Sequence, residues 1–361
     1  MSARPAAGRR PSGLDIFGKQ DHSPVNQDSN GWWGRAMSSD VTAGARPAEP
    51  KIDRSVTLHL RGDWGTANLH RVCGWISQEL TDRCGPHTRI AVWNGRGFSD
   101  AVRAVGRGEV HVAMTTPVAF TTAALDSRGV FGSEGFPDLR ALGVVPQRDR
   151  LVIGVHKSWG ITSFAELREK KPPLKLATSV NDGVNYVGLA AHEILTRSGV
   201  DIRGWGGRLL EDERPFETLD HVKAGRADAV AHEAYMLPAW QDIGRDLHML
   251  EVEQDVLDGL WDDYSWPAAT VDEGHFPASR GFRTLDFSDF LVLTRADLAD
   301  DIAYAIAWVL GETRHIIENQ YRHLAPERSP ITYPLDPATM GVTPVPLHPG
   351  AARYYQALPR A

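Results

Sequence analysis

Four side chains in the C-terminal half could transfer protons or bind a metal. A histidine, a carboxylate and a phenol beside one cleft suit general acid–base chemistry, and with Asp272 or Glu273 they could complete a metal site. The alternative is that they line a polar pocket or form hydrogen bonds in the interior. No His-Glu-x-x-His spacing is present, so we predict no metal and no cofactor. The four are His232, Glu233, Tyr235 and His275.

Two glycine-punctuated loops in the first half carry candidate ligand contacts. Trp64 offers an aromatic face, and Thr66 and Asn68 offer hydrogen bonds. In the second loop Arg96 could clamp an anion beside Asn94. Because that loop opens a helix, its backbone N–H groups also favour a carboxylate or phosphate. The alternatives are that Trp64 packs between two lobes and that Arg96 is solvated.

Two further polar segments follow predicted strands. Thr115 and Thr116 could donate hydroxyl groups, and Asn181 and Asn185 could contact a ligand from a later loop. Asp182 would repel an anion unless the ligand also carries an amine. The alternative is that Asp182 caps the next helix.

The elements that position these loops alternate between strands and helices. Apolar residues at three- and four-residue steps, as from Leu69 to Leu80, predict helices. The alternation predicts mainly parallel sheets covered by helices. We expect strands over 55–60, 89–93, 109–114, 142–145, 151–155, 174–178, 227–231 and 287–294, and helices over 69–80, 99–105, 187–195, 216–222 and 299–318.

The order of these elements predicts two α/β lobes between which the chain crosses twice. We expect a disordered tail over 1–54, lobe I over 55–147 plus 270–361, and lobe II over 148–269. The segment 146–150 is the first crossing. Such lobes bind ligands where the carboxyl ends of their strands meet, and they close around them.

Composition narrows the class of partner. The chain has 361 residues and a net charge of −7 without a basic stripe, which argues against nucleic acid. No apolar run is long enough to span a membrane. Arg9-Arg10 precedes no apolar segment, so no export signal is visible. Trp32-Trp33 could dock onto the body of the protein or onto a partner. Cys73 and Cys84 are either free thiols or one bridge.

Several ordered motifs resemble a family of transport receptors. The segment 345–355, Val-Pro-Leu-His-Pro-Gly-Ala-Ala-Arg-Tyr-Tyr, is similar to the terminal signature of the TAXI-type receptors of TRAP transporters. The segments 108–113, 163–167 and 292–298 also resemble that family's motifs. The resemblance implies the type II periplasmic-binding-protein fold, a carboxylate or amino-acid ligand and a TRAP membrane subunit as partner. This sequence departs from the family at the ligand loops, where bulky or charged residues replace glycines.

The sequence therefore predicts a monomeric solute-binding protein that captures a small organic anion or amino acid between two lobes. The alternative is a cytoplasmic enzyme of the decarboxylase or cofactor-biosynthesis type on the same fold. The resemblance implies a location outside the cytoplasm, whereas the missing signal favours the cytoplasm, so the location stays open.

Overall fold

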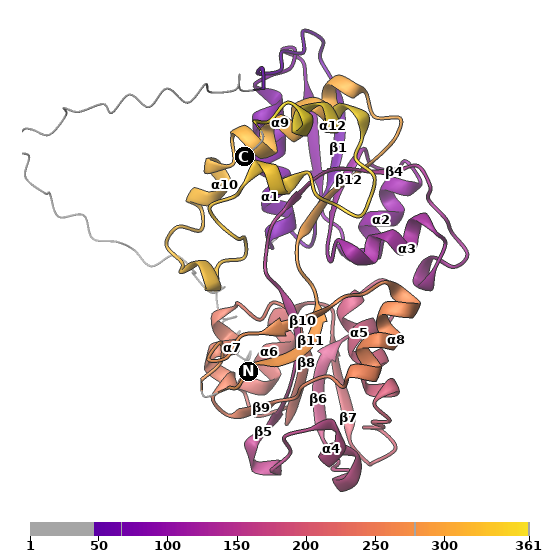
Figure 1. Ribbon diagram of the computed structural model, residues 1–361, viewed down its shortest axis with the longest axis vertical. Coiled ribbons are helices and arrows are strands. Elements are labelled where there is room, and N and C mark those ends of the chain that lie inside the picture. The colour runs from indigo at the N-terminus through magenta and orange to yellow at the C-terminus, as the bar shows by residue number, and fades with distance from the viewer. Residues whose placement is uncertain (1–46, 66, 278, 360–361) are drawn as a thin grey trace, which may run out of the picture. The chain divides into compact units, whose positions relative to one another are not determined.

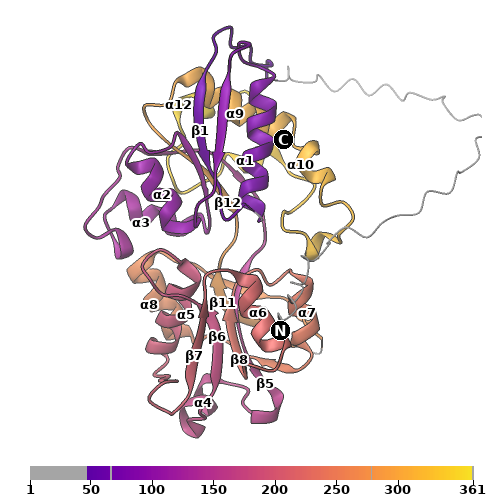
Figure 2. The same cartoon turned by 180° about the vertical axis from the view of Figure 1, so that it is seen from behind.

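The computed structural model describes residues 47–359, except 66 and 278. The arginine pair, Trp32-Trp33, Thr66 and most of the predicted tail lie outside the described residues. The described part forms two α/β lobes joined by two crossing segments (Figures 1 and 2). No helix within it combines the length and the apolar character that crossing a bilayer requires.

Lobe I contains a five-stranded sheet in the order β2-β1-β3-β12-β4. β1, β2 and β3 are parallel, whereas β12 runs antiparallel to both of its neighbours. The prediction of mainly parallel sheets is therefore wrong for β12, because this strand enters lobe I after the second crossing. The strands are β1 (Thr57–Arg61), β2 (Arg89–Trp93), β3 (Val112–Thr115), β4 (Leu139–Val145) and β12 (Phe290–Arg295).

Lobe II contains a sheet in the order β10-β11-β5-β8-β6-β7, with β9 paired to β5. β8, β6 and β7 are parallel to one another, and the remaining pairs are antiparallel. The strands are β5 (Arg150–His156), β6 (Lys175–Ser179), β7 (Arg208–Asp212), β8 (Ala229–His232), β9 (Leu247–Met249), β10 (Ala268–Val271) and β11 (Phe282–Asp286).

Helices cover both sheets, and their apolar faces follow the predicted spacing. On the first helix Leu69, Val72, Ile76 and Leu80 are all buried. Lobe I has α1 (Asn68–Thr81), α2 (Phe98–Gly106), α3 (Thr122–Leu125), α9 (Asp300–Glu312), α10 (His315–Asn319), α11 (Pro337–Met340) and α12 (Pro349–Gln356). Lobe II has α4 (Phe164–Lys170), α5 (Tyr186–Arg197), α6 (Pro215–Lys223), α7 (Pro238–Gly244) and α8 (Gln254–Tyr264). Short 3₁₀ turns lie at Ala119–Thr121, Gly129–Phe131, Lys157–Trp159 and Pro326–Arg328.

Several predicted boundaries need correction. We placed the return to lobe I at residue 270, but β10 and β11 extend the sheet of lobe II to Asp286. The predicted helix over 299–318 is divided at Thr313, whose hydroxyl accepts a hydrogen bond from Trp75 Nε1 at 2.9 Å. Residues 47–54 are not a free tail, since Ile52 is buried and Pro47 O accepts from Trp308 Nε1 at 3.2 Å.

The two crossing segments run side by side and form a hydrogen-bonded hinge. Phe287 N donates to Asp149 O at 3.0 Å, and Asp289 N donates to Gln147 O at 3.3 Å. The Asp289 carboxylate also accepts from Gln147 N at 3.0 Å. The two crossing segments therefore hold each other in place. We expect the lobes to move relative to each other by bending at this hinge.

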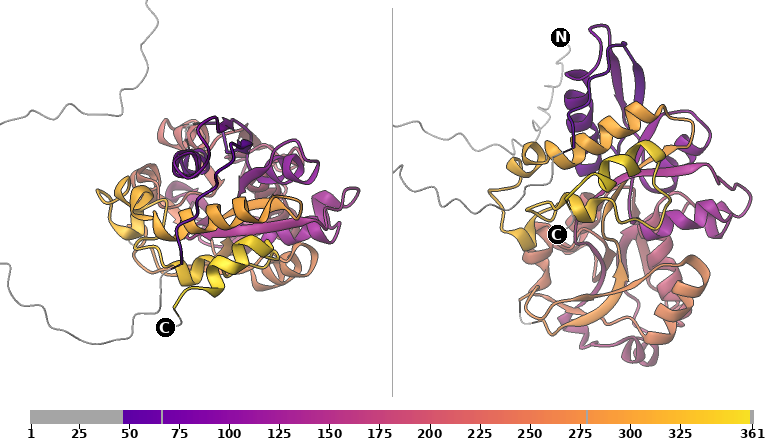
Figure 3. Two further views of the ribbon diagram at one scale, coloured as in Figure 1. Left: turned by 90° about the horizontal axis from the view of Figure 1, so that it is seen from above. Right: turned by 45° about the horizontal axis from the view of Figure 1, so that its top comes forward.

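The terminal signature packs the C-terminal segment onto lobe I and lies outside the ligand loops (Figure 3). His348 is fully buried and caps α12 by accepting from Gly350 N at 3.1 Å. Tyr354 donates to Glu312 at 2.9 Å, and a β-carbon at Gly311 would overlap the Tyr354 hydroxyl. These residues hold α12 against α9, so this part of the resemblance concerns the fold.

An aromatic cluster connects the lobes. Phe120 of lobe I lies 4.2 Å from Tyr186 and 4.7 Å from Trp266 of lobe II, measured between ring centroids. All three rings are fully buried. The hydrophobic core is therefore continuous across the hinge.

The Tyr186 hydroxyl is buried in this cluster and has no hydrogen-bond partner. Burial of an unpaired hydroxyl destabilises the folded state. We expect Tyr186→Phe to raise the free energy of unfolding by about 1 kcal/mol, read as a higher urea midpoint at unchanged slope. A lower midpoint would contradict this reading of the hydroxyl.

Candidate functional site

The first loop of lobe I is shaped by a buried carboxylate. Asp63 accepts hydrogen bonds from Gly65 N at 3.3 Å and from Leu69 N at 3.2 Å. Its burial raises the pKa of the carboxyl group, against the opposing effect of these N–H donors. Gly65 has a φ of 83°, a backbone conformation that favours glycine. This tight turn fixes the backbone next to Trp64, which packs against the edge of the hydrophobic core and lines a cavity.

The second loop of lobe I is bonded directly to the first. Gly95 N donates to Asp63 O at 3.0 Å, and a β-carbon at Gly95 would lie 2.6 Å from Arg61 Nε. Asp100 accepts from Arg61 Nη2 at 2.8 Å and from Arg96 N at 2.9 Å. The two loops therefore form one polar wall.

The opposite wall comes from lobe II, where β7 ends and α6 begins. Asp212 is the last residue of β7, and Pro215 starts the helix, a position that suits proline because it lacks an N–H. Asn185 Nδ2 donates to Glu213 O at 3.3 Å and ties this segment to the start of α5.

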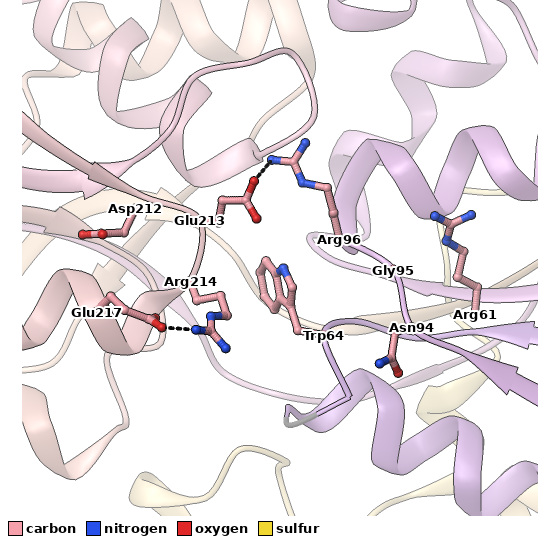
Figure 4. A pocket seen from close by; sticks show the side chains of 9 residues that line it. All are labelled: Arg61, Trp64, Asn94, Gly95, Arg96, Asp212, Glu213, Arg214 and Glu217. Carbon is pink, nitrogen blue, oxygen red and sulfur yellow. Dashed lines mark hydrogen bonds and ion pairs between the residues drawn. The ribbon is translucent and has the colours of Figure 1, made fainter. Parts of the chain in front are cut away.

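These walls enclose a cavity of about 700 Å³, which we call the interlobe cavity (Figure 4). Trp64 lies between the arginine and carboxylate side chains of the two walls. The cavity opens to solvent beside Glu213, whose side chain is 59% exposed. Its lining residues are Arg61, Trp64, Asn94, Gly95 and Arg96 of lobe I and Asp212, Glu213, Arg214 and Glu217 of lobe II.

Every arginine of the interlobe cavity is paired with a carboxylate. Arg61 contacts Asp100, and Arg214 contacts Glu217. Arg96 reaches across the lobes: its Nη2 lies 2.6 Å from Asp182 and 3.4 Å from Glu213. Of these pairs, those of Arg96 join the two lobes, whereas the other two lie within one lobe each.

Five polar atoms in the walls are buried without a hydrogen-bond partner. Three are donors, Arg61 Nε, Trp64 Nε1 and Arg96 Nε, and two are acceptors, Glu217 Oε2 and Asp212 Oδ2. Asp212 Oδ2 lies 3.0 Å from His221 Nε2 without hydrogen-bond geometry. Such atoms are few among the described residues, and unpaired buried polar groups cost free energy. Their concentration at one cavity is what a site for a polar ligand requires.

Of the predicted ligand contacts, Trp64, Asn94 and Arg96 line this cavity. Asn68 does not, because its side-chain oxygen accepts from the Tyr321 hydroxyl at 2.6 Å. Thr66 lies outside the described residues.

The predicted threonine and asparagine contacts have structural partners instead. Thr115 donates to Phe98 O and Thr116 to Phe287 O, each at 3.1 Å. Asn185 caps α5 by accepting from Val187 N at 3.0 Å. Asn181 lines a different cavity, on the side of α5 that carries His192.

Asp182 orders the turn before α5, close to the predicted capping role, and it also has a partner that was not predicted, Arg96. Its carboxylate accepts from Val184 N at 3.0 Å and Asn185 N at 3.1 Å, just before α5, and it also binds Arg96. Burial alone would raise the pKa of Asp182, but Arg96 and the two N–H donors lower it overall.

We expect the Arg96–Asp182 pair to contribute little to stability. The two side chains are 31% and 36% exposed, so water screens their attraction. A double-mutant cycle with Arg96→Ala and Asp182→Ala, measured by urea unfolding, is expected to give a coupling energy of about 0.5–1 kcal/mol. A coupling above about 3 kcal/mol would contradict this expectation, because it is typical of buried pairs.

His232 is the last residue of β8 and does not line the interlobe cavity. It is 1% exposed, and its Nε2 lies 3.0 Å from Ser179 Oγ at the end of the neighbouring strand β6. Burial lowers the pKa of His232, which favours the neutral ring. Glu233 Oε1 is 3.9 Å from His232 Nδ1, and the Asp149 carboxyl group contacts Glu233. Burial, reinforced by Glu233, raises the pKa of Asp149.

Tyr235 and His275 form a separate group at the hinge. Their rings stack with centroids 4.1 Å apart, and Arg328 of the C-terminal segment donates to His275 O at 2.8 Å. Burial lowers the pKa of His275. The four side chains that suggested proton transfer therefore divide into two groups, neither of which lines the interlobe cavity. The described residues bring together no set of three or more His, Cys, Asp or Glu able to hold a metal.

Sequence reasoning missed the lobe II wall and Arg61. The segment Glu211-Asp212-Glu213-Arg214-Pro215 has a readable signal, since an apolar pair precedes it and proline commonly starts a helix. A strand ending there would place these charges at the edge that faces lobe I. Cys73 and Cys84 are both free thiols.

The chain belongs to the NMT1-like family, whose sequence profile matches residues 71–357. A comparison with curated proteins gave no match.

Several solved structures are similar to this chain at low identity. A protein from Bordetella bronchiseptica RB50 is 13% identical, with a TM-score of 0.46 over 86% of this chain and 91% of its own. PhnD1 from Prochlorococcus marinus, in complex with methylphosphonate, is 14% identical, with a TM-score of 0.41 over 75% and 87%. The periplasmic aliphatic sulphonate binding protein SsuA from Escherichia coli is 16% identical, with a TM-score of 0.39 over 84% and 79%.

Proposed function

We propose that this protein is a solute-binding protein that captures a small organic anion or amino acid in the interlobe cavity. The observation that carries the proposal is a cavity with one wall from each lobe beside a two-segment hinge. In such an arrangement a ligand contacts both lobes only when they are closed, so binding stabilises the closed state.

Trp64, Asn94 and Arg96 of lobe I and Glu213, Arg214 and Glu217 of lobe II are the contacts we propose. The resemblance to TAXI-type receptors supports a TRAP membrane subunit as the partner that receives the solute. The test of that partner is co-purification with the membrane subunits of TRAP and ABC transporters expressed separately. Retention by the ABC subunit alone would overturn the TRAP assignment.

Thermal unfolding in the presence of a solute panel tests the binding function. A ligand at a hundred times its dissociation constant should stabilise the protein by about 2.7 kcal/mol. The same solute should give no shift above the buffer control with a variant that carries Trp64→Ala and Arg96→Ala. An unchanged shift in the variant would place the ligand elsewhere.

An enzyme on the same fold is the second candidate, because His232 has Ser179 Oγ 3.0 Å from its Nε2 and Glu233 Oε1 3.9 Å from its Nδ1. It requires the lobes to open, since Ser179 is 2% exposed. Turnover that is lost in His232→Ala while solute binding persists would favour this candidate. Unchanged turnover would exclude His232 from the chemistry.

A further inference from the structure

The charges around the interlobe cavity bear on which kind of solute it accepts. Each of the three wall arginines is paired with a carboxylate, so none has an unneutralised positive charge that would attract an anion. Asp212, the remaining wall acid, lies 3.0 Å from His221 Nε2.

A count of the wall charges and their direct partners gives an excess of negative charge. Three guanidinium groups face six carboxylates, which leaves a net charge of −3 when His221 is neutral. A bare anion would add to this charge, whereas a cation would offset it. The carboxylates are Asp100, Glu109, Asp182, Asp212, Glu213 and Glu217.

The aromatic ring in the cavity is free to receive a cation. The described residues contain two cation–π contacts, Arg83 on Trp308 and Arg103 on Phe131, and neither involves Trp64. Trp64 is therefore an unoccupied ring of the residue type that binds ammonium groups best. Glu217 Oε2, an acceptor without a partner, belongs to the opposite wall.

We propose that the interlobe cavity recognises a protonated amine, held between the Trp64 ring and the carboxylates of Glu213 and Glu217. Primary amines are protonated at neutral pH, and a quaternary ammonium carries the same charge at every pH. Oxygen atoms elsewhere on the solute accept hydrogen bonds from the unpaired donors Trp64 Nε1 and Arg96 Nε. This inference rests on the proposed function and selects amine-bearing solutes, amino acids included, over plain anions.

The experiment compares matched pairs that differ only in the charged nitrogen. Choline is paired with 3,3-dimethylbutan-1-ol, 4-aminobutanoate with butanoate, and each proteinogenic amino acid with its des-amino acid. Thermal shifts of the full chain identify binders, and isothermal titration gives their dissociation constants. We expect at least one amine to bind about tenfold or more tightly than its partner, since a desolvated cation–π contact and a charge-assisted hydrogen bond are lost together.

Three variants test the named residues. Trp64→Leu and Glu217→Gln are expected to weaken the amine about tenfold or more, whereas Glu169→Gln should leave its affinity unchanged. Glu169 is an exposed acid on α4, at the end of lobe II remote from the cavity (Figure 1). The melting temperature of each variant without ligand shows that it folds.

The outcomes separate the two proposals. Equal affinity for amines and their nitrogen-free partners would overturn the amine assignment and leave the binding function standing. No shift with any compound, amine or anion, would count against both proposals. Equal loss of affinity in the Glu169→Gln variant would also overturn the role of the cavity carboxylates.

Discussion

The Phe120→Ala variant is expected to lose about 3–5 kcal/mol of unfolding free energy and to separate the lobes. Phe120 is fully buried, and its ring contacts Tyr186 and Trp266 of lobe II. Truncation removes both of these aromatic contacts between the lobes and leaves a cavity in the cluster. We expect a lower denaturation midpoint and a larger radius of gyration in small-angle X-ray scattering.

Phe164→Ala is the matched control for this variant. Phe164 is 1% exposed and begins α4, within lobe II and remote from lobe I (Figure 1). Its truncation should lower stability by a similar amount without changing the radius of gyration. If Phe120→Ala left the radius unchanged, the aromatic cluster would not be what holds the lobes together.

The second large effect is a pH dependence that arises at the hinge. Burial raises the pKa of Asp289 to about 6, against the opposing hydrogen bond from Gln147 N. The folded state therefore keeps this proton at a pH where the unfolded chain has lost it. Stability from this group is present below about pH 4 and is lost as the pH rises through about 6, by about 1–3 kcal/mol.

Asp289→Asn should remove this dependence. Asparagine still accepts from Gln147 N, does not titrate, and tolerates the φ of 70° at this position. We expect the variant to exceed the parent in stability at pH 8, with the difference shrinking as the pH falls from 6 to 4. Urea unfolding across this range measures it, with Glu169→Gln as a surface control. A difference that does not vary with pH would show that Asp289 is not protonated in the native protein.

Much of the fold was predictable because local patterns specify it. The strands β5, β6 and β8 are short apolar runs, and α1 and α5 carry regular apolar faces. Strand direction was less predictable, because it depends on where the chain crosses between lobes. β10 and β11 were missed since their exposed faces interrupt the apolar runs.

The site was only half predictable, for a physical reason. Loops at strand ends could be located, which found Trp64, Asn94 and Arg96. The sequence does not specify which hydrogen-bond partner a hydroxyl or amide at such a loop will have. The Thr115 hydroxyl and the Asn68 amide form hydrogen bonds within lobe I.

The charged wall of lobe II depended on one strand that the sequence analysis did not assign. The glycine-rich segment 204–207 is typical of a turn, and no strand was predicted after it. That strand, β7, ends at Asp212 and presents Glu213 and Arg214 to the cavity. β7 pairs with β6 in parallel. Because the carboxyl ends of parallel strands lie at the same edge of a sheet, the segment after β7 lies beside the loop after β6.

Amide hydrogen exchange with and without the tightest solute of the panel tests most directly whether the ligand sits between the lobes. The arrangement predicts slower exchange in two segments distant in sequence, 61–65 of lobe I and 212–217 of lobe II, with a smaller change at the hinge. Protection confined to one lobe, or to segments outside the interlobe cavity, would contradict it.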